Sequence, residues 1–278
     1  MATLIDGKLI SAKIKEDIKA KIEELKAKNI TPGLAVILVG EDPASTVYVR
    51  NKEKMCGELG IKSEVYRLPE STTTSELLDL IDKLNENKAI HGILLQHPVP
   101  SHIDEYAAFN RISPKKDVDG FTDVNIGKLV IGKDTFVSCT PNGILAMLKH
   151  ENVDISGKHC VIVGRSNIVG KPMSSLMLKE NATVTICHSK TTNLTEITKQ
   201  ADILIVAIGK PKFITKDMVK KDAVVIDVGI NRIDGKLIGD VDFDNVKEVA
   251  SKITPVPGGV GPMTMVMLMS NTIKASTL

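Results

Sequence analysis

A tyrosine and a lysine four residues apart are the first side chains whose spacing suits chemistry. Tyr48 and Lys52 lie in a segment with helical patterning, so they share one face of the predicted helix. A lysine amine can hold or move a proton, and an aromatic ring can stack on a flat ligand. An alternative interpretation is that Lys52 is one more solvated lysine, because lysines are abundant in this chain. The spacing alone leaves both interpretations open.

Further polar candidates stand at the end of a buried strand and in an irregular loop. Gln96 ends the apolar run that begins at Gly92, and α/β folds place ligand-contacting side chains at that end of a strand. Asp117 and Asp119 lie in a loop, where either carboxylate can accept from a ligand or form a local Asx-turn. Gln96 likewise has the alternative of capping nearby backbone.

A glycine turn in the second half of the chain suits a phosphate. Val161 to Val163 is a short apolar run, the chain turns at Gly164, and helical patterning restarts at Gly170. Such a turn leaves backbone N–H groups free at the positive end of a helix dipole. Ser166 stands where a dinucleotide fingerprint has its second glycine, and the last glycine comes one residue late. The turn therefore predicts either a nucleotide site or an ordinary strand–helix connection.

The residues after the next strand favour NADP over NAD. An acid at this position accepts from the 2′-hydroxyl of the adenosine ribose and disfavours a 2′-phosphate. Here His188, Ser189 and Lys190 follow the strand and no acid is present, while Arg165 lies in the first turn. A solvated turn is the alternative for His188 and Ser189. Gly229 and Ile230 follow a later strand, where glycine lets backbone approach a flat ring.

These candidates are positioned by strand-like and helix-like segments that alternate along the whole chain. In the first half we expect helices at 11–28, 44–59 and 74–87, strands at 34–39, 63–68 and 92–96, a loop at 113–135 and a connecting helix at 141–150. In the second half we expect strands at 159–163, 183–187, 203–207 and 224–228, with helices between the first three and a C-terminal helix from 263. The pattern predicts two α/β domains, the second a Rossmann-type parallel sheet, with a cleft between them.

Composition excludes several classes of function. The chain of 278 residues is 42% hydrophobic and 25% charged, as expected of a globular protein with a sizeable core. Its net charge of +2 and the lack of a basic run with aromatics argue against nucleic acid, and no apolar run is long enough for a membrane span. The charged N-terminus lacks a signal-peptide core, and four cysteines without C-x-x-C spacing suggest reduced, buried thiols in the cytoplasm. The scattered histidines predict no metal site.

Six motifs occur in a fixed order along nearly the whole chain. They are Tyr48-x-x-x-Lys52, Gly92-Ile-Leu-Leu-Gln96, Lys116-Asp-Val-Asp119-Gly-Phe121, Cys139-Thr-Pro-x-Gly143, Gly164-Arg-Ser-x-x-Val-Gly170-x-Pro172 and Pro255-Val-Pro-Gly-Gly-Val-Gly-Pro-Met-Thr264. In this combination the chain resembles the bifunctional methylenetetrahydrofolate dehydrogenase/methenyltetrahydrofolate cyclohydrolase family. One departure is visible: the family more often has Gln-Leu-Pro-Leu-Pro where this chain has Gln96-His97-Pro-Val-Pro100.

The resemblance implies two reactions in one-carbon metabolism, with a link to purine biosynthesis. 5,10-Methylenetetrahydrofolate is oxidised with NADP, and the methenyl product is hydrolysed to 10-formyltetrahydrofolate. It also implies a folate-binding catalytic domain at 1–138, completed by the C-terminal helix 263–278, and an NADP-binding Rossmann domain at 139–262. A cytoplasmic homodimer built through the nucleotide domain is expected.

Roles for individual residues follow from the same resemblance. Lys52 is the expected proton-transfer residue, with a pKa lowered beside the cationic substrate, and Gln96 orients it. Tyr48 stacks on the aminobenzoate ring, and Asp119 accepts from the pterin. The backbone of Pro257, Gly258 and Gly259 approaches the folate. On the cofactor side the expected residues are Gly164, Arg165 and Ser166 for the phosphates, Ser189 for the ribose or its 2′-phosphate and Ile230 for the nicotinamide.

Two rival functions stay open. A monofunctional dehydrogenase needs the Lys52/Gln96 pair less than a bifunctional enzyme does, because hydride transfer calls for little acid–base help. A non-catalytic regulator that binds a nucleotide or folate has the same fold, since fold does not fix function.

Overall fold

The computed structural model describes residues 2–278 and divides into two compact units, each discontinuous in sequence. One unit comprises residues 1–12 and 138–264, and the other comprises 13–137 and 265–278. Two of the three unit boundaries fall inside α1 (Gly7–Lys26) and α10 (Val260–Ala275), and the third lies between residues 137 and 138. The family resemblance implied that residues 1–12 belong to the first domain, whereas in the structure they group with 138–264.

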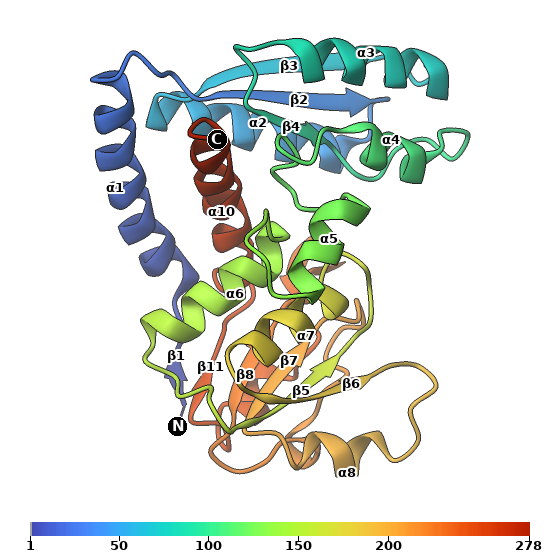
Figure 1. Cartoon of the computed structure of the whole chain (residues 1–278). Coiled ribbons are helices and arrows are strands. Elements are labelled where there is room, and N and C mark those ends of the chain that lie inside the picture. The colour runs from blue at the N-terminus through green and yellow to red at the C-terminus, as the bar shows by residue number, and fades with distance from the viewer. Residues whose placement is uncertain (1) are drawn as a thin grey trace. The chain divides into compact units, whose positions relative to one another are not determined.

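The unit of residues 13–137 and 265–278 is built on a three-stranded parallel sheet with the order β3-β2-β4 (Figure 1). Its strands are β2 (Gly33–Val39), β3 (Lys62–Leu68) and β4 (Gly92–Leu95), and its own helices are α2 (Pro43–Leu59), α3 (Thr74–Glu86), α4 (Glu105–Arg111) and α5 (Asp123–Val130). β2 is buried along its whole length, as expected of a central parallel strand covered on both faces. Alternate residues Ala35, Ile37 and Val39 pack with Leu77 and Ile81 of α3.

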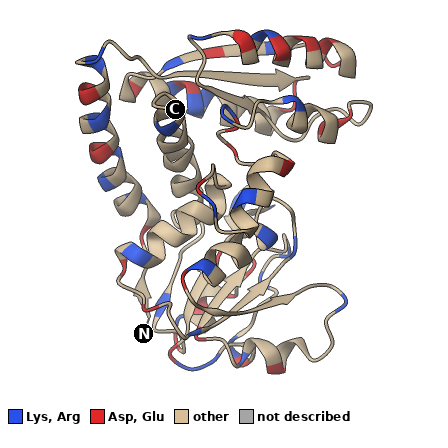
Figure 2. Ribbon diagram, viewed as in Figure 1, with Lys and Arg blue, Asp and Glu red and all other residues tan. Residues whose placement is uncertain are grey.

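Local signals fix the ends of the helices that carry or flank the candidate residues. Asp42 accepts from the Ser45 N–H at 2.7 Å before α2, and Gly60 ends that helix in the left-handed conformation. Thr73 and Glu76 form a capping box at the start of α3. Charges of both signs alternate along α1 and α3, consistent with solvated outer faces (Figure 2).

The unit of residues 1–12 and 138–264 is built on a six-stranded parallel sheet with the order β1-β11-β8-β7-β5-β6. The strands are β1 (Thr3–Leu4), β5 (His159–Val163), β6 (Thr183–Cys187), β7 (Ile203–Val206), β8 (Val224–Asp227) and β11 (Lys252–Ile253). Its helices are α6 (Cys139–His150), α7 (Gly170–Lys179), α8 (Leu194–Thr198), the 3₁₀ helix η1 (Lys216–Met218) and α9 (Phe243–Val246), and β9 (Asn231–Ile233) and β10 (Lys236–Ile238) form a hairpin. α7 packs against β5 and β6.

The predicted fold class is confirmed, and the predicted strands lie within one residue of the observed ones. The predicted loop at 113–135 is wrong in part, because it contains α5. This helix has only eight residues and includes Gly127, so its apolar period is too short to identify, although Thr122 caps it by accepting from the Asn125 N–H. β1 and β11 were not predicted, since two-residue strands carry no periodicity.

All four cysteines are buried, as the sequence predicted. Burial raises the pKa of Cys160 to about 12 and that of Cys56 to about 11. No helix within residues 2–278 is long and apolar enough to cross a membrane.

Candidate active site

The lysine and the glutamine singled out in the sequence form a direct pair. Lys52 lies on α2 and Gln96 directly follows β4, and the Lys52 Nζ donates to Gln96 Oε1 at 2.8 Å. Gln96 is 8% exposed, whereas Lys52 is half-buried. α2 and the end of β4 therefore bring an amine and a neutral acceptor together at the edge of the sheet.

Both hydrogen bonds of the Gln96 amide fix its orientation. The Nε2 group donates to the His97 carbonyl at 2.7 Å, while the Lys52 amine donates to the other end of the amide. Since a carbonyl only accepts and an ammonium only donates, the amide has one orientation that satisfies both. The sequence signals placed Gln96 at the strand end but did not show that the next residue's backbone holds it.

Tyr48 lies one helical turn before Lys52 and is 46% exposed. An exposed aromatic ring beside a polar pair is available for stacking on a flat ligand. The departure at position 97 introduces an exposed side chain, and its Nδ1 contacts Glu105 Oε1 at 2.5 Å.

The two aspartates of the irregular loop have different environments. Asp117 is 2% exposed and accepts from the Phe121 N–H at 3.1 Å, the Thr122 N–H at 2.8 Å and the Asn125 side chain at 2.8 Å. Asp117 therefore binds groups of its own loop, but its partners lie four, five and eight residues on, beyond the two-residue span of the Asx-turn that the sequence left open for either acid. Asp119 is half-buried in the same loop. Sequence reasoning missed Asn271 of α10, which donates to the Val118 carbonyl at 2.8 Å just before Asp119.

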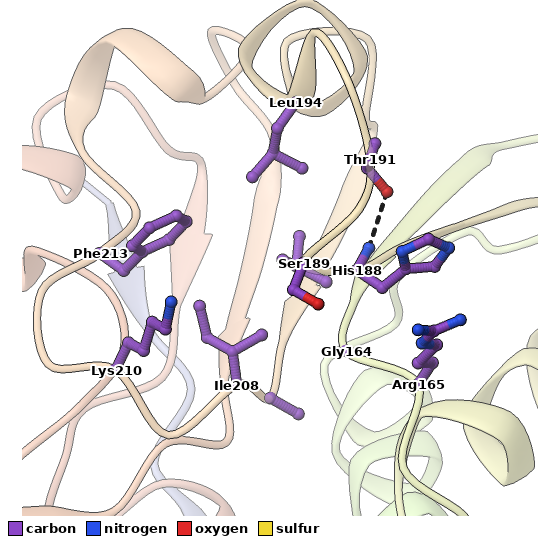
Figure 3. Close-up of a pocket in the computed structure, with 11 residues that line it drawn as sticks. Gly164, Arg165, His188, Ser189, Thr191, Leu194, Ile208, Lys210 and Phe213 are labelled. Atoms are coloured by element: carbon purple, nitrogen blue, oxygen red, sulfur yellow. Dashed lines mark hydrogen bonds between the residues drawn. The ribbon is translucent and has the colours of Figure 1, made fainter.

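A cavity of about 540 Å³ opens at the carboxyl ends of β5, β6 and β7 in the other unit (Figure 3). It is lined by Val163, Gly164, Arg165, His188, Ser189, Thr191, Leu194, Ala207, Ile208, Lys210 and Phe213. In Figure 3 Arg165 and His188 lie on one side, Lys210 and Phe213 on the opposite side, and Ser189 between them. This is the edge where open parallel sheets bind nucleotides.

Glycine at the floor of this cavity is required by the geometry. Gly164 has φ of +132°, and a Cβ there would lie 2.3 Å from the Ala207 carbonyl oxygen. Gly170 at the start of α7 is equally confined, because its Cβ would lie 2.2 Å from the Gly164 oxygen. The two glycines let the turn approach the neighbouring strand end.

Three of the five expected cofactor residues line the cavity: Gly164, Arg165 and Ser189. Ser166 does not line it, and its hydroxyl accepts from the Val169 N–H at 3.1 Å. Ile230 is 52% exposed and lies outside the lining set. The roles expected of both stay predictions. Sequence reasoning missed Lys210 and Phe213, which lie in the loop after β7.

The residues present fit a phosphorylated dinucleotide. None of the lining residues is acidic, while Arg165, His188 and Lys210 supply donors for a phosphate. Thr191 Oγ1 accepts from the His188 N–H at 2.8 Å and fixes the turn that presents Ser189. Leu194, Ile208 and Phe213 supply apolar surface for a base.

The predicted folate-facing turn is backbone-rich and tightly packed. Gly258 has φ of +108°, and a Cβ on Gly259 would lie 2.6 Å from the Pro255 oxygen. A Cβ on Gly7 would lie 1.8 Å from the Gly259 oxygen, so the start of α1 packs on this turn. The approach of Pro257, Gly258 and Gly259 to folate stays a prediction.

No group of three or more His, Cys, Asp or Glu side chains within the part of the chain that the structure describes is arranged to hold a metal ion. One unit thus presents a Lys–Gln pair at a sheet edge, and the other a nucleotide-type cavity on a parallel sheet. These features define a nucleotide-dependent α/β enzyme of two units.

Comparison with known proteins identifies the family. Residues 5–119 match the tetrahydrofolate dehydrogenase/cyclohydrolase catalytic domain, and residues 138–278 match the tetrahydrofolate dehydrogenase/cyclohydrolase NAD(P)-binding domain. A bifunctional protein FolD of Halalkalibacterium halodurans is 62% identical over 275 residues, which cover 99% of each chain. The chain belongs to the tetrahydrofolate dehydrogenase/cyclohydrolase family.

Solved structures agree in fold. The bifunctional enzyme FolD, methylenetetrahydrofolate dehydrogenase/cyclohydrolase, of Campylobacter jejuni matches with a TM-score of 0.98 at 51% identity, covering 100% of this chain and 99% of that chain. The Trypanosoma brucei methylenetetrahydrofolate dehydrogenase-cyclohydrolase, complexed with NADP and an inhibitor, matches with a TM-score of 0.95 at 37% identity, covering 99% and 97%. The predicted family and its use of a nicotinamide dinucleotide are confirmed.

Proposed function

We propose that this chain catalyses two consecutive reactions of one-carbon metabolism. It oxidises 5,10-methylenetetrahydrofolate to the 5,10-methenyl compound with NADP, and it hydrolyses that product to 10-formyltetrahydrofolate. The observation that carries the proposal is the 2.8 Å hydrogen bond between Lys52 and Gln96, in a chain that matches both family domains.

The Lys52/Gln96 pair suits the hydrolytic step. Addition of water to the methenyl carbon and opening of the ring both need a group that accepts and returns a proton. Lys52 would perform these transfers through Nζ, and Gln96 would hold that atom in place. Because Gln96 is uncharged, it orients the amine without favouring the charged form as a carboxylate would.

The oxidative step makes smaller demands on side chains. The bound dinucleotide supplies a hydride acceptor, and the chain has to align the methylene carbon with it. The folate nitrogen beside that carbon stabilises the cation formed when hydride leaves. Gly164, Arg165 and Ser189 line the cavity that would hold the dinucleotide, and Ser166 lies in the same turn. Ile230 would contact the nicotinamide.

Folate recognition would divide between a ring, a carboxylate and a backbone turn. Tyr48 would stack on the aminobenzoate ring through its exposed face. Asp119 would accept from paired N–H groups of the pterin. Pro257, Gly258 and Gly259 would present backbone, since side chains in this turn would block a close approach.

The wider setting of the enzyme is proposed on chemical grounds. Residues 13–137 with 265–278 would form the folate-binding domain, and residues 1–12 with 138–264 the NADP-binding domain. Four buried cysteines suit a reducing compartment and therefore the cytoplasm. The 10-formyl product is a one-carbon donor of the kind purine biosynthesis consumes. A homodimer through the nucleotide domain is expected from the family resemblance.

A spectrophotometric assay with 5,10-methylenetetrahydrofolate tests the proposal. NADP and NAD are supplied in parallel, and reduced cofactor and methenyl product are followed separately. Accumulation of reduced NADP with little methenyl product supports both activities. Accumulation of methenyl product in step with reduced cofactor would show a monofunctional dehydrogenase, and binding of either ligand without turnover would show a regulator.

A further inference from the structure

Two buried carboxylates near the nucleotide cavity have no part in the reactions described above. Asp227 is the last residue of β8, and Asp240 follows β10. They are 3% and 0% exposed, respectively. Burying a carboxylate costs free energy unless hydrogen bonds compensate it, so the contacts of these two groups indicate what they are for.

Asp240 holds a loop that lines the nucleotide cavity. Its Oδ2 accepts from the N–H groups of Ile208 at 2.7 Å and Gly209 at 2.9 Å, directly after β7. Ile208 and the nearby Lys210 both line the cavity. The position of this wall therefore depends on a carboxylate that does not itself line the cavity.

The two carboxylates also contact the residues on either side of Ile230, the Gly229 backbone and the Asn231 side chain. Asp227 Oδ1 accepts from the Gly229 N–H at 2.9 Å, and Asp240 Oδ1 accepts from the Asn231 side chain at 2.9 Å. Asp227 and Asp240 are themselves linked, because Asp227 Oδ1 also accepts from the Asp240 N–H at 2.9 Å. Thus one connected group of bonds joins the ends of β7 and β8 to the β9–β10 hairpin.

Glycine makes room for this arrangement. A Cβ on Gly229 would lie 2.3 Å from Asp240 Oδ1, and a Cβ on Gly239 would lie 1.8 Å from Asp227 Oδ2. Any other residue at these two positions would displace a carboxylate from the backbone groups it contacts.

We propose that Asp227 and Asp240 are positioning residues for the dinucleotide. Their carboxylates set the distance between the 208–210 wall of the cavity and the backbone around Ile230, the residue expected at the nicotinamide. This inference rests on the proposed use of NADP. Neither carboxylate touches the cofactor, and both act through the N–H groups that they fix.

Asp240→Asn tests the proposal with little change in shape. The substitution replaces one carboxylate oxygen by an NH₂ group, which donates. That group would face N–H donors that the carboxylate oxygen accepts from, so the loop has to shift. We expect the dissociation constant of NADPH to rise about tenfold, the loss that corresponds to one buried N–H left without its acceptor. NADPH fluorescence measures this against a low background, because the chain contains no tryptophan. Hydrolysis of methenyltetrahydrofolate without NADP should keep at least about half of its rate.

Asp202→Asn is the matched control. Asp202 accepts from the His159 N–H at 2.9 Å in the same sheet, but at the amino end of β7. This variant should lose stability without a change in NADPH affinity. The positioning role would be overturned if Asp240→Asn bound NADPH as tightly as wild type does. It would also be overturned if both activities fell in parallel with the melting temperature. Failure of wild type to bind NADPH would instead refute the proposed function.

Discussion

At the scale of single residues, the Lys52/Gln96 pair separates the two proposed activities. An amine is needed for proton transfer in hydrolysis, whereas hydride transfer depends on alignment. Gln96 is held by the His97 backbone, so its orientation does not depend on the side chain at position 97. A substitution of Lys52 should therefore act selectively.

Lys52→Met keeps an unbranched apolar stem and removes the amine. We expect cyclohydrolase activity to fall by about 10²-fold or more, the usual contribution of a positioned acid–base group. Much of the NADP affinity should remain, because the nucleotide cavity lies on the other unit. The two activities are assayed separately on the same preparation, and an equal loss of both would remove Lys52 from proton transfer.

Arg165→Ala tests which phosphate this side chain meets. If Arg165 pairs with the 2′-phosphate, KM for NADP should rise about tenfold, as expected for loss of a charge-assisted hydrogen bond. KM for NAD, which lacks that phosphate, should change little. Equal effects on the two cofactors would place Arg165 elsewhere along the dinucleotide.

The buried Asp227 gives a pH dependence with a defined sign. Burial raises its pKa to about 6 from an ordinary value of 3.8, with hydrogen bonds from Val241, Asp240 and Gly229 opposing the shift and the Asp240 charge adding to it. The folded chain therefore binds this proton more tightly than the unfolded chain. The stabilisation of the folded chain by this proton is complete below about pH 4 and is lost as the pH rises through about 6.

Asp227→Asn removes this titration. Between pH 7 and pH 4.5 wild type should gain roughly 2 kcal/mol of unfolding free energy relative to the variant. Urea unfolding of both chains at the two pH values measures the difference, in which the other titrating groups cancel. A difference that stays constant with pH would contradict the raised pKa.

At the scale of elements, the turn from β5 into α7 depends on close backbone approach. Gly164→Ala forces a Cβ against the Ala207 oxygen and an unfavourable φ, at a cost of roughly 1–3 kcal/mol. We expect weaker NADP binding together with a lower melting temperature. Gly235→Ala is the control, because Gly235 also has a positive φ of +76° but nothing within 4 Å of its Cβ. If both variants bind NADP like wild type, the turn does not shape the cofactor site.

Elements with strong local signals could be predicted from the sequence. α2, α3 and their strands carry such signals: the apolar run of β2, the caps Asp42 and Thr73, and Gly60 at the end of α2. These signals locate the elements within a few residues of their observed bounds. β1 and β11 could not be predicted, because these strands form only by pairing with each other and with β8. The Asp227–Asp240 contact was hidden for the same reason, since the groups that it joins come from the ends of β7 and β8 and from the segment after β10.

At the scale of the whole molecule, the C-terminal segment completes the unit that carries Lys52. The Asn271 side chain donates to the carbonyls of Val118 at 2.8 Å and Val137 at 3.1 Å, and Lys274 contacts Asp134 at 2.6 Å. Asn271 is 5% exposed. The loop that presents Asp119 thus depends on residues from the opposite end of the sequence.

Asn271→Ala removes the donor to both carbonyls. The expected loss of unfolding free energy is roughly 1–3 kcal/mol, and KM for the folate substrate should rise because Val118 adjoins Asp119. Denaturant unfolding and folate kinetics are measured together. Asn271→Asp places a buried carboxylate against the same two carbonyls and should lose at least as much, whereas wild-type behaviour of both variants would show that the loop is held by other contacts.

The discontinuous units have a practical consequence. A chain opened between residues 137 and 138 yields two fragments, and each carries a segment that belongs to the other fragment's unit. The first fragment contains residues 1–12 of the nucleotide-type unit, and the second contains residues 265–278 of the unit that holds Lys52. Each half alone is therefore incomplete. Folding requires residues 1–12 of the first fragment to pack with the second fragment, and residues 265–278 of the second to pack with the first. The enzyme is a natural scaffold for a split reporter, in which turnover returns when two fused partners bring the halves together.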